Sequence, residues 1–97
     1  MPENESEPKI ISLDPNSLYT QETRVYRSGI KKVNLKDPIK FGKDAKGRPY
    51  VTDGNHKSRK AWEQGVPVLG QQVATAKFDV TQDADFRHIS QLRVLES

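Results

Sequence analysis

The residues best suited to chemistry lie in one stretch, Val51–Lys60 (VTDGNHKSRK), which combines turn, acidic and basic residues. Asp53, Gly54 and Asn55 bring turn and helix-capping chemistry directly after a β-prone run. A helix that begins near Asn55 exposes its first N–H groups, which favour an anion, and neighbouring basic side chains can close around it. The pattern therefore predicts a phosphate site. Its expected contacts are Gly54, Asn55, His56, Lys57 and Arg59.

A second interpretation of the same stretch is purely structural. Asp53 or Asn55 then caps the helix, and the basic side chains form an ordinary solvated surface. His88 has no partner at metal-ligand spacing and receives no role.

The distribution of charge favours a phosphate-bearing partner. The net charge is +3, but residues 24–60 carry twelve Lys and Arg against three Asp, whereas the other residues carry four bases against ten acids. A basic centre attracts nucleotides or nucleic acid, although the same charge also serves solubility. The side chains expected to contact a nucleic acid backbone are Arg24, Arg27, Lys31, Lys32 and Lys40.

Length and composition indicate one small domain. The 97 residues are 33% hydrophobic and 30% charged, which supplies one modest core beneath a charged surface. No apolar run is long enough to span a membrane and no basic-then-apolar leader is visible, so we expect a cytoplasmic protein that does not bind membranes. With no cysteine and two histidines, the sequence offers no thiol chemistry and no metal site rich in cysteine or histidine.

The chemical residues must be positioned by a small α/β (α+β) fold with a short mixed sheet and two or three helices. Residues 1–8 are acidic and polar, and we expect a disordered tail there, with the domain in residues 9–97. The elements expected are a strand in residues 9–14, a helix over residues 18–33 interrupted near Gly29, a hairpin of residues 39–42 and 48–52, a ten-residue helix from about Asn55 to Gln64, and a strand in residues 66–74.

Two local expectations accompany this outline. On the helix that ends at Gln64, Ser58, Ala61 and Trp62 share one face, and Trp62 is expected to anchor the core. The last twenty residues remain open between a helix over residues 84–92 and an extended segment.

The stretch Tyr50–Val68 resembles the signature of the ParB/sulfiredoxin superfamily, in which a strand leads through an Asp-Gly turn into a helix that is closed by a glycine and followed by a Val-Pro-Val strand. Residues 10–15 resemble the opening strand of that family, and residues 37–41 resemble the strand before its hairpin. The resemblance covers residues 9–74 and leaves residues 75–97 as an extension. It implies a small α/β fold that binds phosphate groups at the start of the helix, with ATP or CTP and Mg²⁺ as the cofactor or with none.

Carried over to this sequence, the resemblance makes Gly54 the glycine that lets the backbone approach the ligand. His56 and Lys57 become the pair that faces the phosphate, and Arg59 becomes a second basic contact. In a branch of the superfamily that phosphorylates small hydroxyl compounds, Asp53 would be a base or metal ligand, with Glu22 on the preceding helix as a second carboxylate.

The departures from the family are equally informative. Sulfiredoxins carry their catalytic cysteine where Asn55 stands, so their chemistry has no nucleophile here. The partition proteins carry an acid in this turn that assists nucleotide hydrolysis, and the position of Asn55 offers none. Residues 75–97 are too few to supply both a helix-turn-helix domain and a dimerisation segment.

The sequence leaves three functions open. The first is a non-catalytic or weakly catalytic module that binds a nucleotide or a nucleic acid backbone. The second is a metal-dependent nuclease or small-molecule kinase that uses Asp53 and His56. The third is a protein-interaction module that binds a larger partner, or a homodimer formed through residues 78–95.

Overall fold

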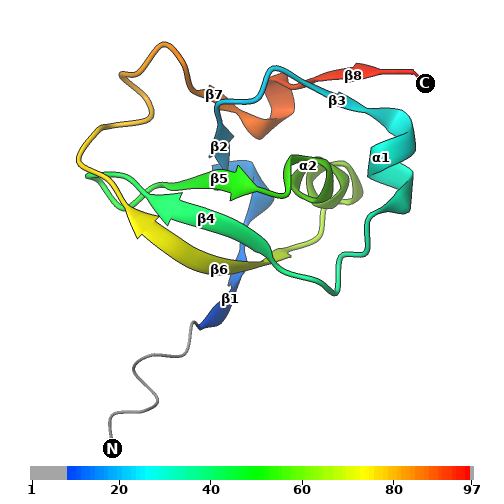
Figure 1. The fold of residues 1–97 in the computed structure, drawn as a ribbon, viewed down its shortest axis with the longest axis horizontal. Coiled ribbons are helices and arrows are strands. Elements are labelled where there is room, and N and C mark those ends of the chain that lie inside the picture. Colours follow the sequence, from blue (N-terminus) through cyan, green and yellow to red (C-terminus); the bar gives the residue numbers. More distant parts are fainter. Residues whose placement is uncertain (1–8, 97) are drawn as a thin grey trace, which may run out of the picture.

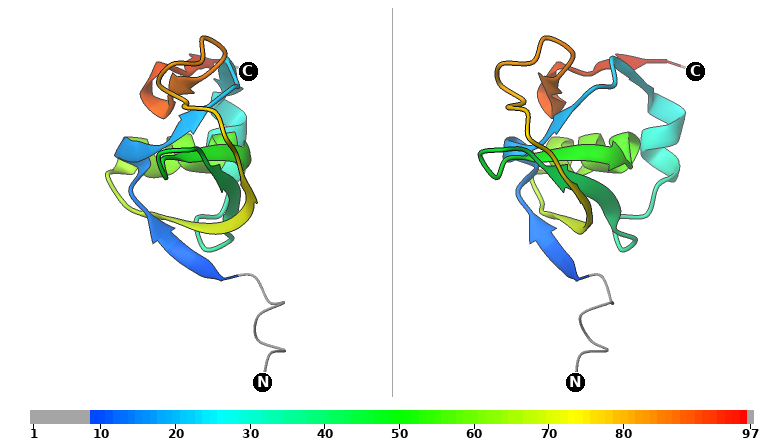
Figure 2. Two further views of the ribbon diagram at one scale, coloured as in Figure 1. Left: turned by 90° about the vertical axis from the view of Figure 1, so that its left-hand side faces the viewer. Right: turned by 60° about the vertical axis from the view of Figure 1, so that its left-hand side comes forward.

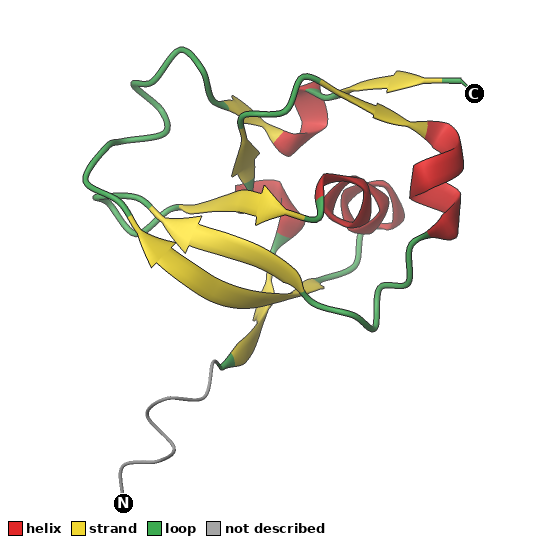
Figure 3. Ribbon diagram, viewed as in Figure 1, coloured by secondary structure: helices red, strands yellow, loops and turns green. Residues whose placement is uncertain are grey.

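The computed structural model describes residues 9–96, so the tail predicted for residues 1–8 lies outside the described residues. Figure 3 shows a fold made of strands, short helices and connecting loops. In chain order the elements are β1 (Ile10–Leu13), the 3₁₀ helix η2 (Pro15–Ser17), β2 (Tyr19–Thr20), β3 (Arg24–Tyr26), α1 (Arg27–Lys32), β4 (Ile39–Lys43), β5 (Pro49–Asp53), α2 (Asn55–Gln64), β6 (Val68–Thr75), β7 (Arg87–His88), the 3₁₀ helix η3 (Ile89–Gln91) and β8 (Arg93–Leu95).

The strands form a mixed sheet of six members and a separate pair. The large sheet has the order β1-β6-β4-β5-β2-β7, and β3 pairs with β8 alone. Within the large sheet β6 runs parallel to β4 and β2 runs parallel to β5, whereas the other neighbours are antiparallel. Figure 2 shows β1 and the segment from β7 to β8 at opposite ends of the molecule. The predicted α+β fold with a short mixed sheet is confirmed.

Helix α2 lies at the centre of the molecule, between the large sheet and the β3–β8 pair (Figure 1). The strands on its sheet side contribute Ile39, Phe41, Val51 and Val68 to the core, all of them buried. The predicted hairpin is present as the antiparallel pair β4–β5, and the predicted strand after α2 is β6. Within residues 9–96, neither helix reaches the length and apolar character that crossing a bilayer requires.

The helix predicted over residues 18–33 is wrong except at its end. The chain forms β2 and β3 there, and only α1 is helical. The periodic pattern did pick buried positions, because Leu18, Val25 and Ile30 are all in the core. Residues 19–26 are rich in threonine, tyrosine and valine, which fit a pleated strand better than a helix. Their partner strands are distant in sequence, so the local pattern could not reveal them.

The open question about the last twenty residues is resolved in favour of an extended segment. Residues 84–92 contain no α-helix, and η3 is flanked by the short strands β7 and β8. Ile89 and Leu92 are buried, so this segment closes the core above α2. The expectation for Trp62 also needs correction. Trp62 is only partly buried, and the residues of its helix face that reach the core completely are Ser58 and Ala61.

The turn between β4 and β5 is built around a buried carboxylate, Asp44. Its side chain accepts hydrogen bonds from the backbone N–H groups of Lys46, Arg48 and Val80, at 2.7–3.0 Å. It thereby joins the hairpin turn to the loop that follows β6. Burial acts to raise the pKa of the Asp44 carboxyl, but these hydrogen bonds and the charge of Arg48 act more strongly together and lower it.

The lowered pKa of Asp44 predicts a loss of stability in acid. The folded protein holds this carboxylate ionised more firmly than the unfolded chain does. The carboxylate therefore makes its full contribution to the free energy of unfolding above the unfolded pKa of about 3.9. The contribution is lost as the pH falls through the lower folded value. We expect Asp44→Asn to lower the free energy of unfolding at pH 7 and to flatten its decline below about pH 4, measured by urea unfolding. An equal acid-induced decline in both proteins would contradict this role.

Candidate functional site

The strand β5 passes into α2 through a single residue, Gly54. Its backbone has φ 113° and ψ 36°, a left-handed conformation that glycine adopts readily. A β-carbon at this position would also lie 2.5 Å from the Cγ2 atom of Ile39. Gly54 has no side chain to cap the helix. The first helical hydrogen bond runs from the N–H of Ser58 to the backbone carbonyl of Gly54, at 2.9 Å. The N–H groups of the first turn are therefore available to a ligand, as the sequence predicts.

Asn55 ties the helix start to strand β2. The hydroxyl of Thr20 donates to the Oδ1 atom of Asn55 at 2.5 Å, and the backbone N–H of Glu22 donates to the Thr20 hydroxyl at 3.0 Å. Thr20 is buried, with 1% of its surface exposed. The Asn55 carbonyl is thus held in place and the first residue of α2 has a fixed orientation.

His56 is held by the backbone of β3. The N–H of Tyr26 donates to its Nε2 atom at 3.1 Å, and the ring lies against Gly29 of α1, where a β-carbon would collide with it. Because Nε2 accepts this hydrogen bond, the neutral ring carries its proton on Nδ1. Nε2 is consequently engaged and does not serve as a general base in this geometry.

A cavity of about 360 Å³ opens beside the helix start, lined by Gly54, Asn55, His56 and Lys57. The rest of its wall comes from Glu22, Val25, Val33, Pro38 and Asp53. Lys57 has no ion-pair or hydrogen-bond partner within the described chain. Four of the five predicted phosphate contacts therefore surround one cavity.

Two carboxylates share this cavity with the cation. Asp53 is exposed at the end of β5. In the register of the β4–β5 hairpin its backbone lies opposite that of Lys40. Glu22 was expected on a helix, but it lies in the connection between β2 and β3. The parallel pairing of β2 with β5 brings that connection beside Asp53 and places both residues at the cavity wall.

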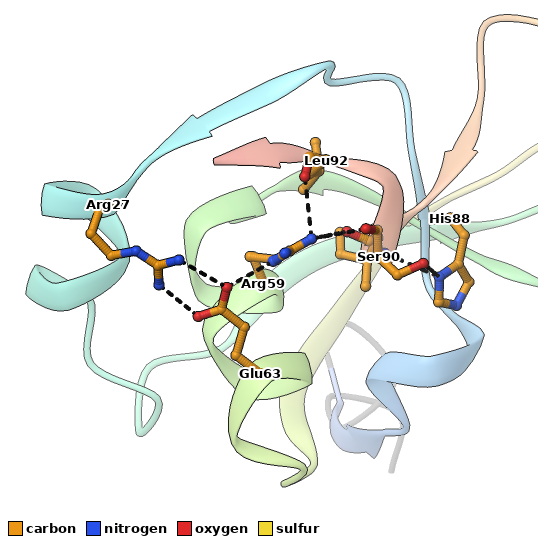
Figure 4. A network of polar contacts seen from close by, with 7 residues as sticks. Arg27, Arg59, Glu63, His88, Ser90 and Leu92 are labelled. Atoms are coloured by element: carbon orange, nitrogen blue, oxygen red, sulfur yellow. Dashed lines mark hydrogen bonds and ion pairs between the residues drawn. The ribbon is translucent and has the colours of Figure 1, made fainter. Parts of the chain in front are cut away.

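The fifth predicted contact, Arg59, lies elsewhere, and its assignment as a phosphate ligand is corrected. Figure 4 shows its guanidinium turned toward the C-terminal segment. Its Nη1 atom donates to the backbone carbonyls of Ile89, Ser90 and Leu92 at 3.0–3.3 Å, and its Nε atom donates to Glu63 at 3.0 Å. Only 13% of the side chain is exposed, so its charge is not offered to an external anion.

The same guanidinium belongs to a compact network on the side of α2 remote from the sheet. Its carbon atom lies 4.6 Å from the ring centroid of Trp62, a cation–π distance. Glu63 also accepts from Arg27 at 2.7 Å. The hydrogen bond from Arg27 is the main cause that lowers the pKa of the Glu63 carboxyl, and the hydrogen bond from Arg59 lowers it further against the opposing effect of burial.

The five predicted nucleic acid contacts differ in their surroundings. Arg27 is engaged with Glu63 and is removed from the set. The other four side chains are exposed on three elements: Arg24 on β3, Lys31 and Lys32 on α1, and Lys40 on β4. These four charges remain exposed to solvent.

Sequence reasoning missed the residues that support the site from β2 and β3. Thr20 and the backbone N–H of Tyr26 hold Asn55 and His56, respectively. Neither carries a local signal, because their role depends on strand pairings between distant segments. Strand propensity in residues 19–26 was the one indication available.

Substitutions of Arg59 and Lys57 should have different effects on the free energy of unfolding. We expect Arg59→Ala to lower the free energy of unfolding by about 2–3 kcal/mol, because several backbone carbonyls and Glu63 lose a charged donor. We expect Lys57→Ala to change it by less than about 0.5 kcal/mol, because Lys57 makes no such contacts. Urea unfolding followed by circular dichroism measures both. Equal losses of unfolding free energy would show that the contacts of Arg59 with residues 89–92 do not stabilise the fold.

Comparison with known proteins adds information on the fold. No family model matches the chain, and no curated protein matches it either. Among solved structures, the protein Atu1540 from Agrobacterium tumefaciens is similar, with a TM-score of 0.61 and 18% sequence identity. The match covers 74% of this chain and 42% of that protein, so the chain spans less than half of its length. At this identity the likeness establishes a shared α/β fold, on which this chain places an uncapped helix start beside a cavity.

Proposed function

We propose that the chain binds a phosphate group, carried by a nucleotide or by a nucleic acid backbone, at the start of α2. One observation carries the proposal. Gly54 opens α2 in a left-handed conformation with no side-chain cap, and the first turn lines a cavity of about 360 Å³ beside an unpaired Lys57. Backbone N–H groups at a helix start and a nearby ammonium are the usual components of a phosphate site.

The contacts favour binding over turnover. His56 uses Nε2 to accept from Tyr26, which leaves Nδ1–H as a donor to an anion and leaves no free basic nitrogen. Arg59, which could have neutralised charge developing on a transferred phosphoryl group, is committed to the C-terminal segment. The resemblance of residues 50–68 to the ParB/sulfiredoxin superfamily supports the same location, and we propose membership of that superfamily with it.

An amide chemical-shift titration with ATP, CTP, inorganic phosphate and a short DNA duplex tests the proposal. We expect the N–H signals of Asn55, His56 and Lys57 to shift with at least one of these ligands. Lys57→Ala should weaken the binding about tenfold, because a charge-assisted hydrogen bond of about 1.4 kcal/mol is lost. Lys46→Ala is the matched control, because Lys46 is an exposed lysine in the β4–β5 turn.

The ligands separate the two forms of the proposal. Shifts confined to the helix start with ATP or CTP indicate a nucleotide pocket. Shifts that extend to Lys31, Lys32 and Lys40 with duplex alone indicate a nucleic acid backbone. Absence of shifts at residues 54–57 with every ligand, or equal weakening by Lys46→Ala and Lys57→Ala, would remove the phosphate site.

A second candidate function, metal-dependent phosphoryl or phosphodiester chemistry, is favoured by one observation. Glu22 and Asp53 both line the cavity that Lys57 faces. Within residues 9–96 no three His, Asp or Glu side chains are grouped to hold a metal ion. Mg²⁺ is commonly bound by one or two carboxylates together with substrate phosphates, so such an ion would arrive with the nucleotide.

This candidate predicts that turnover requires Asp53. We expect hydrolysis of ATP, CTP or plasmid DNA to depend on Mg²⁺ and to fall at least a hundredfold in Asp53→Asn. Asp85→Asn, which neutralises an exposed carboxylate in the loop after β6, should leave the rate unchanged. Phosphate release and plasmid nicking measure the two reactions. Absence of turnover in the unaltered protein would leave binding as the function.

A further inference from the structure

A second hollow lies beside the candidate phosphate site, on the other side of Val33. It has a volume of about 560 Å³ and is bounded by residues 33–36, by the C-terminal half of α2 and by the first residues of β6. Its lining residues are Val33, Asn34, Leu35, Lys36, Lys60, Gln64 and Leu69. Val33 lines both hollows, but the residues of the phosphate site do not reach the second one. This second hollow is called the linker groove below.

The walls of the linker groove are aliphatic. Leu35 packs partly against the core, and Leu69 is 36% exposed at the start of β6. Val33 is half-buried between them and α1. Exposed aliphatic side chains that line a concave surface are typical of a site that accepts another apolar side chain.

Two lysines give the groove a positive charge. The Nζ atom of Lys60 donates to the carbonyl of Val33 at 2.8 Å, so its ammonium is fixed at the groove and keeps two N–H donors for another acceptor. Lys36 is exposed at the other wall. No carboxylate is among the lining residues, and Glu63, on the same helix, is neutralised by Arg27 and Arg59.

The shape of the groove is held by the protein itself. The side-chain oxygen of Asn34 accepts a hydrogen bond from the backbone N–H of Lys36 at 2.9 Å. The backbone carbonyl of Asn34 accepts one from the N–H of Asp37 at 3.1 Å. These bonds form a tight turn, and Lys60 binds the same linker to α2. A groove that is already formed costs little ordering on binding.

The chemistry of the groove selects among charged partners. Aliphatic side chains beside the fixed ammonium of Lys60 and the exposed ammonium of Lys36 complement aliphatic side chains that alternate with carboxylates. No aromatic ring lines the groove, so a nucleobase has no surface on which to stack. We propose that the linker groove binds a peptide segment of a partner protein that carries aspartate or glutamate beside leucine, isoleucine or valine.

Selection from a displayed library of random twelve-residue peptides tests the proposal, because it assumes no particular partner. The bait is the full chain, and the counter-bait is the double variant Lys36→Glu with Leu69→Ser, which changes only exposed side chains. We expect the peptides that survive counter-selection to be enriched in acidic and aliphatic residues. The dominant synthetic peptide should shift the amide signals of Asn34, Leu35, Gln64 and Leu69.

Matched variants place the binding in the groove. Lys36→Glu should weaken the dominant peptide at least fivefold, whereas Lys77→Glu, the same charge change at an exposed lysine after β6, should weaken it less than twofold. Leu69→Ser should also weaken it, and Ile10→Ser, at a more exposed position on β1, should not. Lys57→Ala should leave peptide affinity unchanged, which separates this site from the phosphate site.

Three results would overturn the proposal. One is a library that yields no enrichment over the double variant, and another is an enriched peptide that is basic or shifts residues away from the groove. The third is a twelve-nucleotide oligothymidylate that shifts the groove residues when no peptide does, which would assign the groove to nucleic acid.

Discussion

The contact between the backbone of Gly54 and the side chain of Ile39 fixes where α2 begins and which way it points. Because no β-carbon fits there, the end of β5 lies directly against the start of β4, and the helix leaves the sheet without an intervening loop. Ser58 and Ala61 then face the core and are completely buried. The same direction of the axis leaves the first turn beside the cavity and turns Arg59 toward the C-terminal segment.

Several arginines hold the structure together, whereas most lysines are exposed. Arg27, Arg48 and Arg59 are each in ion pairs, and the last of them also binds backbone carbonyls. A guanidinium suits this use because it presents several donors in a rigid plane. The surface charge that a ligand can meet is therefore carried mainly by lysines, among them Lys57 at the cavity beside α2 and Lys36 at the linker groove. The excess of positive charge counted in residues 24–60 overstates the charge that is open to a partner.

The sequence predicts the part of the fold whose signals are local. The hairpin β4–β5, the glycine turn, α2 and β6 all follow from alternation, turn residues and helix periodicity within a few residues of one another. The four predicted phosphate contacts that line the cavity beside α2 come from that local stretch. The helix predicted from residue 18 was wrong because Leu18 and Val25, seven residues apart, have a spacing that also fits a helix. Strands β2 and β3, which form there instead, pair with β5 and β8 far along the chain. Arg59 failed for the same reason, since its acceptors belong to residues 89–92.

The parallel pairing of β3 with β8 joins residues 24–26 to residues 93–95. During synthesis on a ribosome, β3 cannot pair with β8 until residues 93–95 have emerged. The guanidinium of Arg59 likewise lacks its carbonyl acceptors until residues 89–92 have emerged. Pairings that close such long loops form late and slowly. A nascent chain therefore leaves the side of α2 that carries Arg59 uncovered until residues 89–95 have been synthesised.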